Sequence, residues 1–238
     1  MNELWINKKR YFCKGSFDEL TQNEFIEIAW AMNFEESKAN LMILYSLLKM
    51  GQVQRSFLRR TITKLDLDNF SELLRLTNFV RKLKIEKNPF ANFKSLQSPS
   101  YLHDFSFGHY INMDTYFLKY QNSKKVQHLD NLLSIFFGSQ NLDEKIIKKV
   151  QKFSDKEKNA VLVCFLAFRT MLVTTFPKVF EGSSSGKKAT WGQVLRRVAG
   201  NVIQMKDVSE LPATQVFFDI SETIKDYQEQ EAQLNAQK

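Results

Sequence analysis

The chain has little glycine, proline or cysteine: its 238 residues include 8 Gly, 4 Pro and 2 Cys. This scarcity of helix-breaking residues, together with long apolar runs of helical period, favours helices. Cys13 and Cys164 lie far apart, so they form no disulfide framework, and we expect a reducing compartment. The first ten residues carry charges with no apolar stretch behind them, which is not the pattern of a secretory signal.

Signatures of a membrane span or a nucleotide-binding loop are also missing. The nearest approach to a span, residues 160–176, contains Arg169 and is shorter than the ~20 residues that a span needs. We therefore expect a buried core helix there and no membrane span. Residues 181–188 (EGSSSGKK) resemble a phosphate loop only in composition, because no apolar strand precedes them and the spacing is wrong. They are expected to form a surface loop.

Residues suited to catalysis or metal binding are few and scattered. His103, His109 and His128 have no cysteine or carboxylate at metal-ligand spacing, and zinc needs three or four converging ligands. Asp114 lies among aromatic residues and could be a carboxylate with a shifted pKa, but no partner base accompanies it. A solvent-facing or tyrosine-bonded Asp114 is therefore favoured. We expect no catalytic residue, metal, cofactor or small-molecule substrate.

The net charge of +8 is unevenly spread along the chain. Residues 38–94 contain 12 Lys and Arg against 4 Asp and Glu, whereas residues 207–238 contain 2 Lys against 7 Asp and Glu. Such a dipole suits nucleic-acid binding at the basic end, head-to-tail contact between subunits, or solubility alone. The candidate phosphate, DNA or subunit contacts, which a plain solvated face would equally explain, are Arg55, Arg59, Arg60, Arg81, Lys82, Lys84, Arg196 and Arg197.

The densest aromatic stretch, residues 105–137, predicts two consecutive helices around which the others pack. Apolar and aromatic residues recur there at the i, i+3, i+4, i+7 spacing of one helical face. On the first helix these residues are Phe107, Tyr110, Ile111, Phe117 and Leu118; on the second they are Leu129, Leu132, Leu133, Phe136 and Phe137.

Further helices are predicted by capping signals and by the same period. Thr21 with Glu24, and Ser154 with Glu157, match the capping box, in which each side chain satisfies a backbone donor of the other residue. The other predicted helices are 37–50, which Gly51 closes, one begun by Asp68, a short helix or turn at 55–63, 141–150 and 191–199. Pro177 is expected to mark the change from helix to loop.

The fold class that follows is mainly α, a multi-helix bundle with a short N-terminal β-hairpin or extended arm. Residues 4–17 alternate around a basic turn at Lys8-Lys9-Arg10, which predicts the hairpin. The expected organisation is an arm at 1–20, a basic helical part at 21–87, a linker at 88–104 with two prolines, and an aromatic helical core with a C-terminal amphipathic helix at 105–238.

The C-terminal stretch, residues 212–238, carries a heptad-like seam that Glu231 interrupts. Its candidate partner-helix residues are Phe217, Ile220, Ile224, Tyr227 and Leu234. The seam covers two to three heptads, which is fewer than a coiled coil requires. We expect its first half to dock on the core and its Gln- and Glu-rich end either to project to a partner or to fray.

Two stretches resemble structural and assembly proteins of tailed phages of the Bacteroidota. YFCKGSFDELTQNEFI, from Tyr11, is similar to a Y-x-x-P-x-S-W-x-E-L-T-x-x-Q-Y/F opening. FSFGHYINMDTYFLKY, from Phe105, and LDNLLSIFF, from Leu129, are similar to an F-x-F-G-x-Y-I-x-A-D-x-Y-x-x-x-Y … L-D-x-L-x-A-x-L-Y-R signature, and residues 176–180 fit the F-P-x-L-F segment that follows. The chain departs from the pattern where Lys14 and Gly15 replace the proline region and Gly138 replaces the basic ending.

The resemblance implies a non-enzymatic component of a virion, assembled in the host cytoplasm, with a head–tail connector ring or a tail protein as the expected role. Partners would be further copies of the chain and other phage structural proteins, with DNA in possible proximity. Two alternatives stay open: a tail-assembly chaperone that is absent from the mature particle, and a basic nucleic-acid-binding module that uses residues 38–94.

Overall fold

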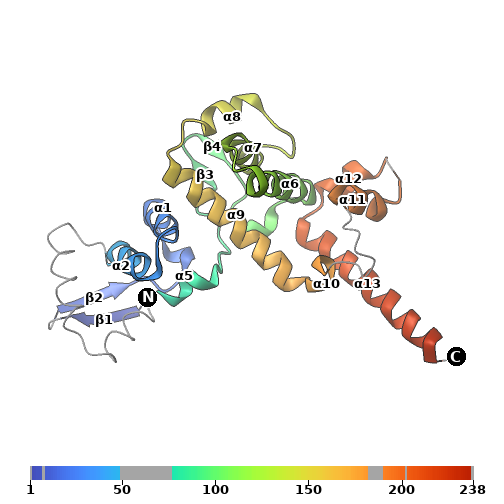
Figure 1. The fold of residues 1–238 in the computed structure, drawn as a ribbon, viewed down its shortest axis with the longest axis horizontal. Coiled ribbons are helices and arrows are strands. Elements are labelled where there is room, and N and C mark those ends of the chain that lie inside the picture. Colours follow the sequence, from blue (N-terminus) through green and yellow to red (C-terminus); the bar gives the residue numbers. More distant parts are fainter. Residues whose placement is uncertain (1, 7–8, 49–76, 182–189, 202, 237–238) are drawn as a thin grey trace. The chain divides into compact units, whose positions relative to one another are not determined.

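A computed structural model of the chain describes residues 2–6, 9–48, 77–181, 190–201 and 203–236 (Figure 1). The structure is mainly α, which confirms the predicted fold class. It consists of two compact units, of which unit 1 is Met1–Phe90 with Phe153–Ala167 and unit 2 is Ala91–Lys152 with Phe168–Lys238. The predicted boundary segment, 88–104, contains the point at which the chain first passes from unit 1 to unit 2.

Unit 1 begins with the predicted hairpin. Strands β1 (Asn2–Ile6) and β2 (Lys9–Cys13) pair antiparallel, with Asn2 opposite Cys13. Helices α1 (Gln22–Ala31), α2 (Glu36–Leu47) and α5 (Asn78–Lys82) follow, and the first part of α9 (Asp155–Thr175) completes the unit. Its core includes an aromatic contact between Phe25 and Phe90, whose ring centroids lie 5.5 Å apart. Gly51, residues 55–63 and the helix begun by Asp68 lie outside the described residues.

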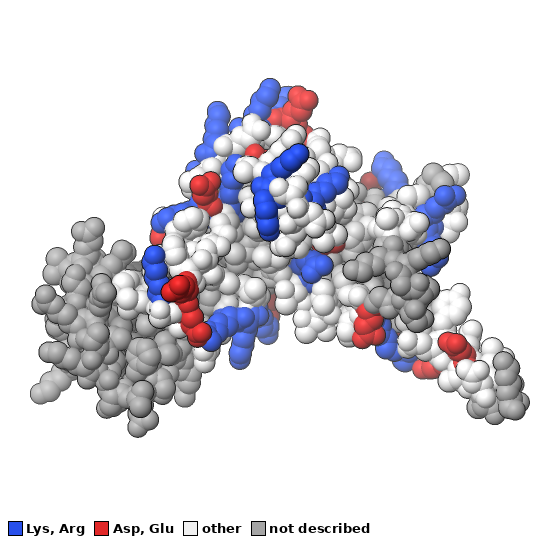
Figure 2. Space-filling view, in the orientation of Figure 1, with Lys and Arg blue, Asp and Glu red and all other residues white. Residues whose placement is uncertain are grey.

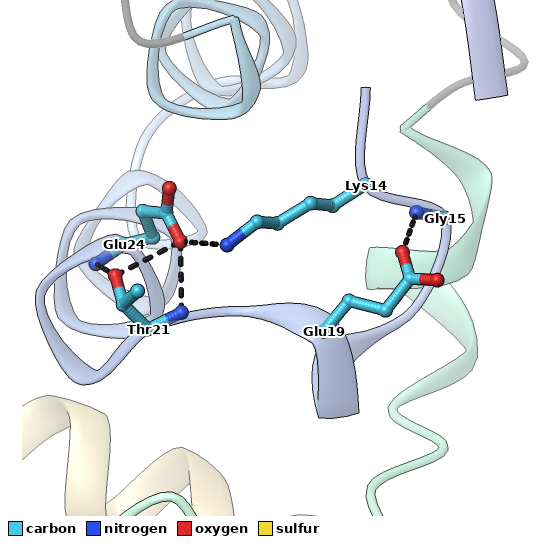
Figure 3. Close-up of polar contacts among 5 residues, drawn as sticks. All are labelled: Lys14, Gly15, Glu19, Thr21 and Glu24. Atoms are coloured by element: carbon cyan, nitrogen blue, oxygen red, sulfur yellow. Dashed lines mark hydrogen bonds and ion pairs between the residues drawn. The ribbon is translucent and has the colours of Figure 1, made fainter. Parts of the chain in front are cut away.

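The N-terminus of α1 has the predicted capping box (Figure 3). The Thr21 hydroxyl accepts the backbone N–H of Glu24, and the Glu24 carboxylate accepts the backbone N–H of Thr21 at 2.8 Å. The ammonium group of Lys14, which follows β2, donates a hydrogen bond to the same carboxylate oxygen. The hairpin strand and α1 are therefore joined by a charged hydrogen bond at the start of the helix.

Unit 2 contains the aromatic pair α6 (Phe107–Ser123) and α7 (Val126–Phe137), as the aromatic spacing predicts. The short helix α8 (Glu144–Val150) packs on α7, and the second part of α9 follows. After it come α10 (Pro177–Phe180), α11 (Trp191–Ala199), α12 (Met205–Glu210) and α13 (Ala213–Ala236). The starts of α6 and α13 lie side by side, because Phe107 N–H donates to Leu211 O at 2.8 Å and Ala213 N–H donates to Phe105 O at 2.9 Å.

The core of unit 2 is a cluster of aromatic rings. Phe217, on the first half of α13, is fully buried and has its ring centroid 5.2 Å from that of Tyr110 and 5.4 Å from that of Phe107. The ring centroids of Phe180 and Trp191 lie 5.3 and 5.7 Å from that of Phe217. The first half of α13 therefore docks on the core, as predicted.

Three features differ from the sequence expectations. α9 ends at Thr175, but Pro177 begins the short helix α10 instead of a loop, since proline at the first helical position loses no hydrogen bond. The short helix α12 was not predicted, because its six residues show no apolar period. Residues 88–104 contain a small hairpin, β3 (Asn92–Phe93) with β4 (Leu96–Gln97), and bury Phe93 and Leu96.

Candidate functional site

A buried polar cluster of unit 2 centres on Asp114, in the middle of α6. Its side chain is 3% exposed, and each carboxylate oxygen accepts one hydrogen bond. Arg169 of α9 donates its Nε to Oδ1 at 2.7 Å, and Trp191 of α11 donates its indole N–H to Oδ2 at 2.7 Å. The favoured expectation of a solvent-facing or tyrosine-bonded Asp114 is therefore wrong, because the partners come from two helices distant in sequence.

This cluster holds three helices together. Burial lowers the pKa of the Arg169 guanidinium, but the hydrogen bond to Asp114 outweighs burial and the pKa is raised. Tyr110, one turn before Asp114, is fully buried; burial and the negative charge of Asp114 raise the pKa of its hydroxyl far above the ordinary value. Because both Asp114 oxygens already accept hydrogen bonds from fixed donors, the arrangement suits positioning of α6, α9 and α11 rather than proton transfer.

The motif glycine, Gly108, marks a close approach between α6 and its neighbours. A Cβ at this position would lie 2.0 Å from the Gln140 side chain and 3.0 Å from the backbone oxygen of Ser209, which lies in the last turn of α12. Gln140 in turn donates to that same Ser209 oxygen at 3.0 Å. The next residue, His109, bonds the Ser106 hydroxyl and the Gly138 carbonyl, and burial lowers its pKa despite the Gly138 contact. These motif residues therefore serve packing.

The predicted basic contacts are divided between the two units. In unit 1, Arg81 forms an ion pair with Glu36 of α2, Lys84 lies 3.4 Å from Glu86, and Lys82 is exposed. In unit 2, Arg196 and Arg197 are exposed in the last turn of α11, where cations suit the helix dipole. Arg55, Arg59 and Arg60 lie outside the described residues.

The predicted seam on α13 changes from buried to exposed along the helix. Phe217 is buried, and Ile220 and Ile224 are half-buried. Farther along, Tyr227 is 69% exposed and Leu234 is 62% exposed. The last three turns of α13 therefore present apolar side chains that no part of the described structure covers.

A second exposed surface was not singled out from the sequence. It lies at the turn between α6 and α7, and we call it the α6–α7 turn surface: Leu118, Lys119, Lys124, Lys125 and Val126. Leu118, which the helical spacing predicts on the packed face of α6, is instead 45% exposed, because it lies near the free end of that helix. Val126 is 56% exposed, and all three lysines are exposed. Figure 2 shows Lys and Arg side chains gathered over the part of unit 2 that α6, α7 and α8 occupy.

A sequence signal for this surface existed. Residues 115–129 contain three lysines and no Asp or Glu. The helical period of residues 105–137 indicates only the buried face, which carries most of the aromatic residues, and so does not indicate this charged turn.

The described residues contain little that suggests a metal site or a membrane span. Within the described ranges no group of three or more His, Cys, Asp or Glu could hold a metal ion. In the same ranges α9 is the one helix long and apolar enough to cross a membrane, and half of its most apolar window is buried. The core helix of a soluble protein can be equally long and apolar, so the absence of a membrane span stays a prediction. Comparison of the chain with protein-family models, curated proteins and solved structures finds no match.

Proposed function

We propose that this chain is a non-enzymatic structural component of a tailed-phage particle, an oligomeric head–tail connector ring or tail protein. The observation that carries the proposal is the order and extent of the sequence resemblance, which runs from Tyr11 to Phe180 through three successive motifs. A match in chain order over most of the length is less easily produced by composition than a single motif.

The positions of the motif residues support a scaffold role. Phe105, Phe107, Gly108, Tyr110 and Asp114 of the central motif are all buried in unit 2. Because these motif residues form the core, the surface of unit 2 is made by other residues, which are free to contact other molecules. The exposed end of α13 is the clearest such surface, and repeated interfaces of this type build rings.

Mass spectrometry of purified particles tests the proposal. The chain should be found in the mature particle at a fixed copy number relative to the other structural proteins. Analytical ultracentrifugation should find a defined multimer, alone or with phage partners. A chain that is absent from particles would be the tail-assembly chaperone instead, and a strict monomer even with phage partners would exclude both assembly roles.

Nucleic-acid binding is a second candidate, favoured by the excess of Lys and Arg in residues 38–94 and by the exposure of Lys82. It requires binding that weakens steeply with salt, because phosphate contacts release counterions. Replacing Arg55, Arg59 and Arg60 with Glu should then abolish DNA or RNA binding. The matched control reverses three lysines of α8, Lys145, Lys148 and Lys149. Absence of binding at low salt, or equal loss in both variants, would rule this candidate out.

A further inference from the structure

We propose that the exposed end of α13 in one copy binds the α6–α7 turn surface of a second copy. The inference rests on the proposed oligomer-forming function and names the contact that would build it. Four properties of the two surfaces carry it: opposite charge, apolar residues on both sides, exposure of both in one chain, and separation along unit 2.

The α13 surface combines apolar and acidic side chains. Tyr227 and Leu234 are seven residues apart, so they share one helical face. Asp226 precedes Tyr227, and Glu231 lies on the seam between Tyr227 and Leu234; Thr223, Asp226 and Gln230 surround the Tyr227 side chain. The positions that border a heptad seam hold uncharged Thr223, Gln228 and Gln230. The negative charge near the apolar pair therefore comes from Asp226 and Glu231.

The α6–α7 turn surface has the complementary composition. Leu118 and Val126 provide exposed apolar area, and lysines surround them without a neighbouring acid in residues 115–129. Lys119 lies over the Tyr116 ring, 4.8 Å from its centroid, which orders its stem against α6. An acidic helix with two apolar side chains gains both area burial and ion pairs on such a surface.

The occupant is a second copy because one chain cannot bring these surfaces together. α6 and α13 begin side by side, and the turn surface lies at the far end of α6, about 25 Å away at 1.5 Å per residue. Figure 1 shows α13 running from that shared start away from α6 to the C-terminus. Leu234 lies about 30 Å along α13. Both surfaces are accordingly exposed.

The contact joins two different surfaces and is therefore heterologous. Each copy has one α13 end to offer and one turn surface to accept, so contacts repeat from copy to copy. Such contacts close into a ring when the rotation between copies allows it and otherwise extend into a filament. A self-paired α13 coiled coil is less suited, since the exposed seam is short and has Glu231 at a core position.

Charge reversal tests the contact. Replacing Asp226 and Glu231 with Lys, or Lys119 and Lys125 with Glu, should each weaken self-association at least tenfold in sedimentation velocity experiments on the full chain. An equimolar mixture of the two reversed variants should regain association. The reversed α13 end of one variant then faces the reversed turn surface of the other, and the two unaltered surfaces also remain complementary. Circular dichroism checks that each variant keeps its helix content.

The matched control replaces Glu222 and Glu229, on the opposite face of α13, with Lys. This variant has the same charge change and should associate like the unaltered chain. Association that is unchanged in both reversed variants would overturn the contact while leaving the proposed function intact. An unaltered chain that stays monomeric at every concentration, even with phage partners, would overturn both.

Discussion

Glu24 shows how a single carboxylate can fix the entry into a helix. Burial of the carboxyl raises its pKa, but hydrogen bonds from Lys14 and from the backbone and hydroxyl of Thr21 outweigh burial and lower the pKa to about 2. The ordinary value is 4.5. Because the folded pKa is depressed, the stabilisation is fully present above pH 4.5 and is lost as the pH falls from 4.5 towards 2.

The Glu24→Gln substitution should therefore change the acid side of the stability profile. At pH 7 the variant should unfold at a lower denaturant concentration, by about 1 kcal/mol, since one cap and one charged hydrogen bond are lost. Between pH 4.5 and pH 2 its stability should fall less than that of the unaltered chain, which circular dichroism in urea measures. Glu27→Gln, which removes an exposed pair with Lys156, serves as control and should keep the original acid slope.

Asp114 makes a different kind of contribution, because it joins three helices rather than starting one. In Asp114→Asn the amide can accept from only one of the two donors, so either Arg169 or Trp191 loses its partner. We expect a loss of about 2 kcal/mol in the free energy of unfolding, moderated because the Arg169 side chain is 33% exposed and can reach water.

Urea unfolding followed by tryptophan fluorescence measures this loss and also reports on Trp191. Asp219→Asn, on the exposed surface of α13, is the control and should change stability by less than about 0.5 kcal/mol. Equal stability of Asp114→Asn and the control would show that the cluster does not hold the helices.

At the scale of elements, α13 is one helix with two separate tasks. Its first half is part of the unit 2 core, whereas its second half is exposed. Phe217→Ala should destabilise the chain by about 3–5 kcal/mol, since a fully buried ring is removed. Leu234→Ala should change stability by less than about 0.5 kcal/mol and yet weaken self-association. Thermal unfolding and sedimentation of the two variants separate the tasks; a Leu234→Ala chain that loses fold stability would contradict this division.

The elements that sequence predicts well are those with strong local signals. Helix α11 matches its predicted range of 191–199, and the capping boxes at Thr21 and Ser154 are both present. Helix α12 and the hairpin of β3 and β4 lacked such signals: six residues without a period, and strands of two residues each. Their stability comes from packing, which periodicity does not report.

The polar cluster was unpredictable for a related reason. Asp114 is visible in the sequence as an acid among aromatic residues, but its partners lie 55 and 77 positions away. Only the packing of α6 against α9 and α11 brings them together. The exposed surfaces were predictable in part. The spacing of apolar residues predicted the α13 seam, but only the fold shows where that seam passes from buried to exposed.

At the scale of the whole molecule, the uneven charge distribution should govern association. Residues 207–238 carry more Asp and Glu than Lys, whereas the whole chain has a net charge of +8. The acidic segment of one copy therefore attracts the basic surface of another. Salt screens such attraction, because the Debye length falls from about 10 Å at 0.1 M to about 3 Å at 1 M. Apolar contacts of Tyr227 and Leu234 are not screened in this way.

Self-association should therefore weaken by at least tenfold between 0.1 M and 1 M NaCl without disappearing, which sedimentation equilibrium measures. The Glu222→Lys, Glu229→Lys control should show the same dependence. Reversal of Asp226 and Glu231 should remove or invert it, since lysines then face lysines and salt screens a repulsion. If association of the unaltered chain strengthened with salt, apolar burial alone would join the copies. Asp226 and Glu231 would then have no part in the contact.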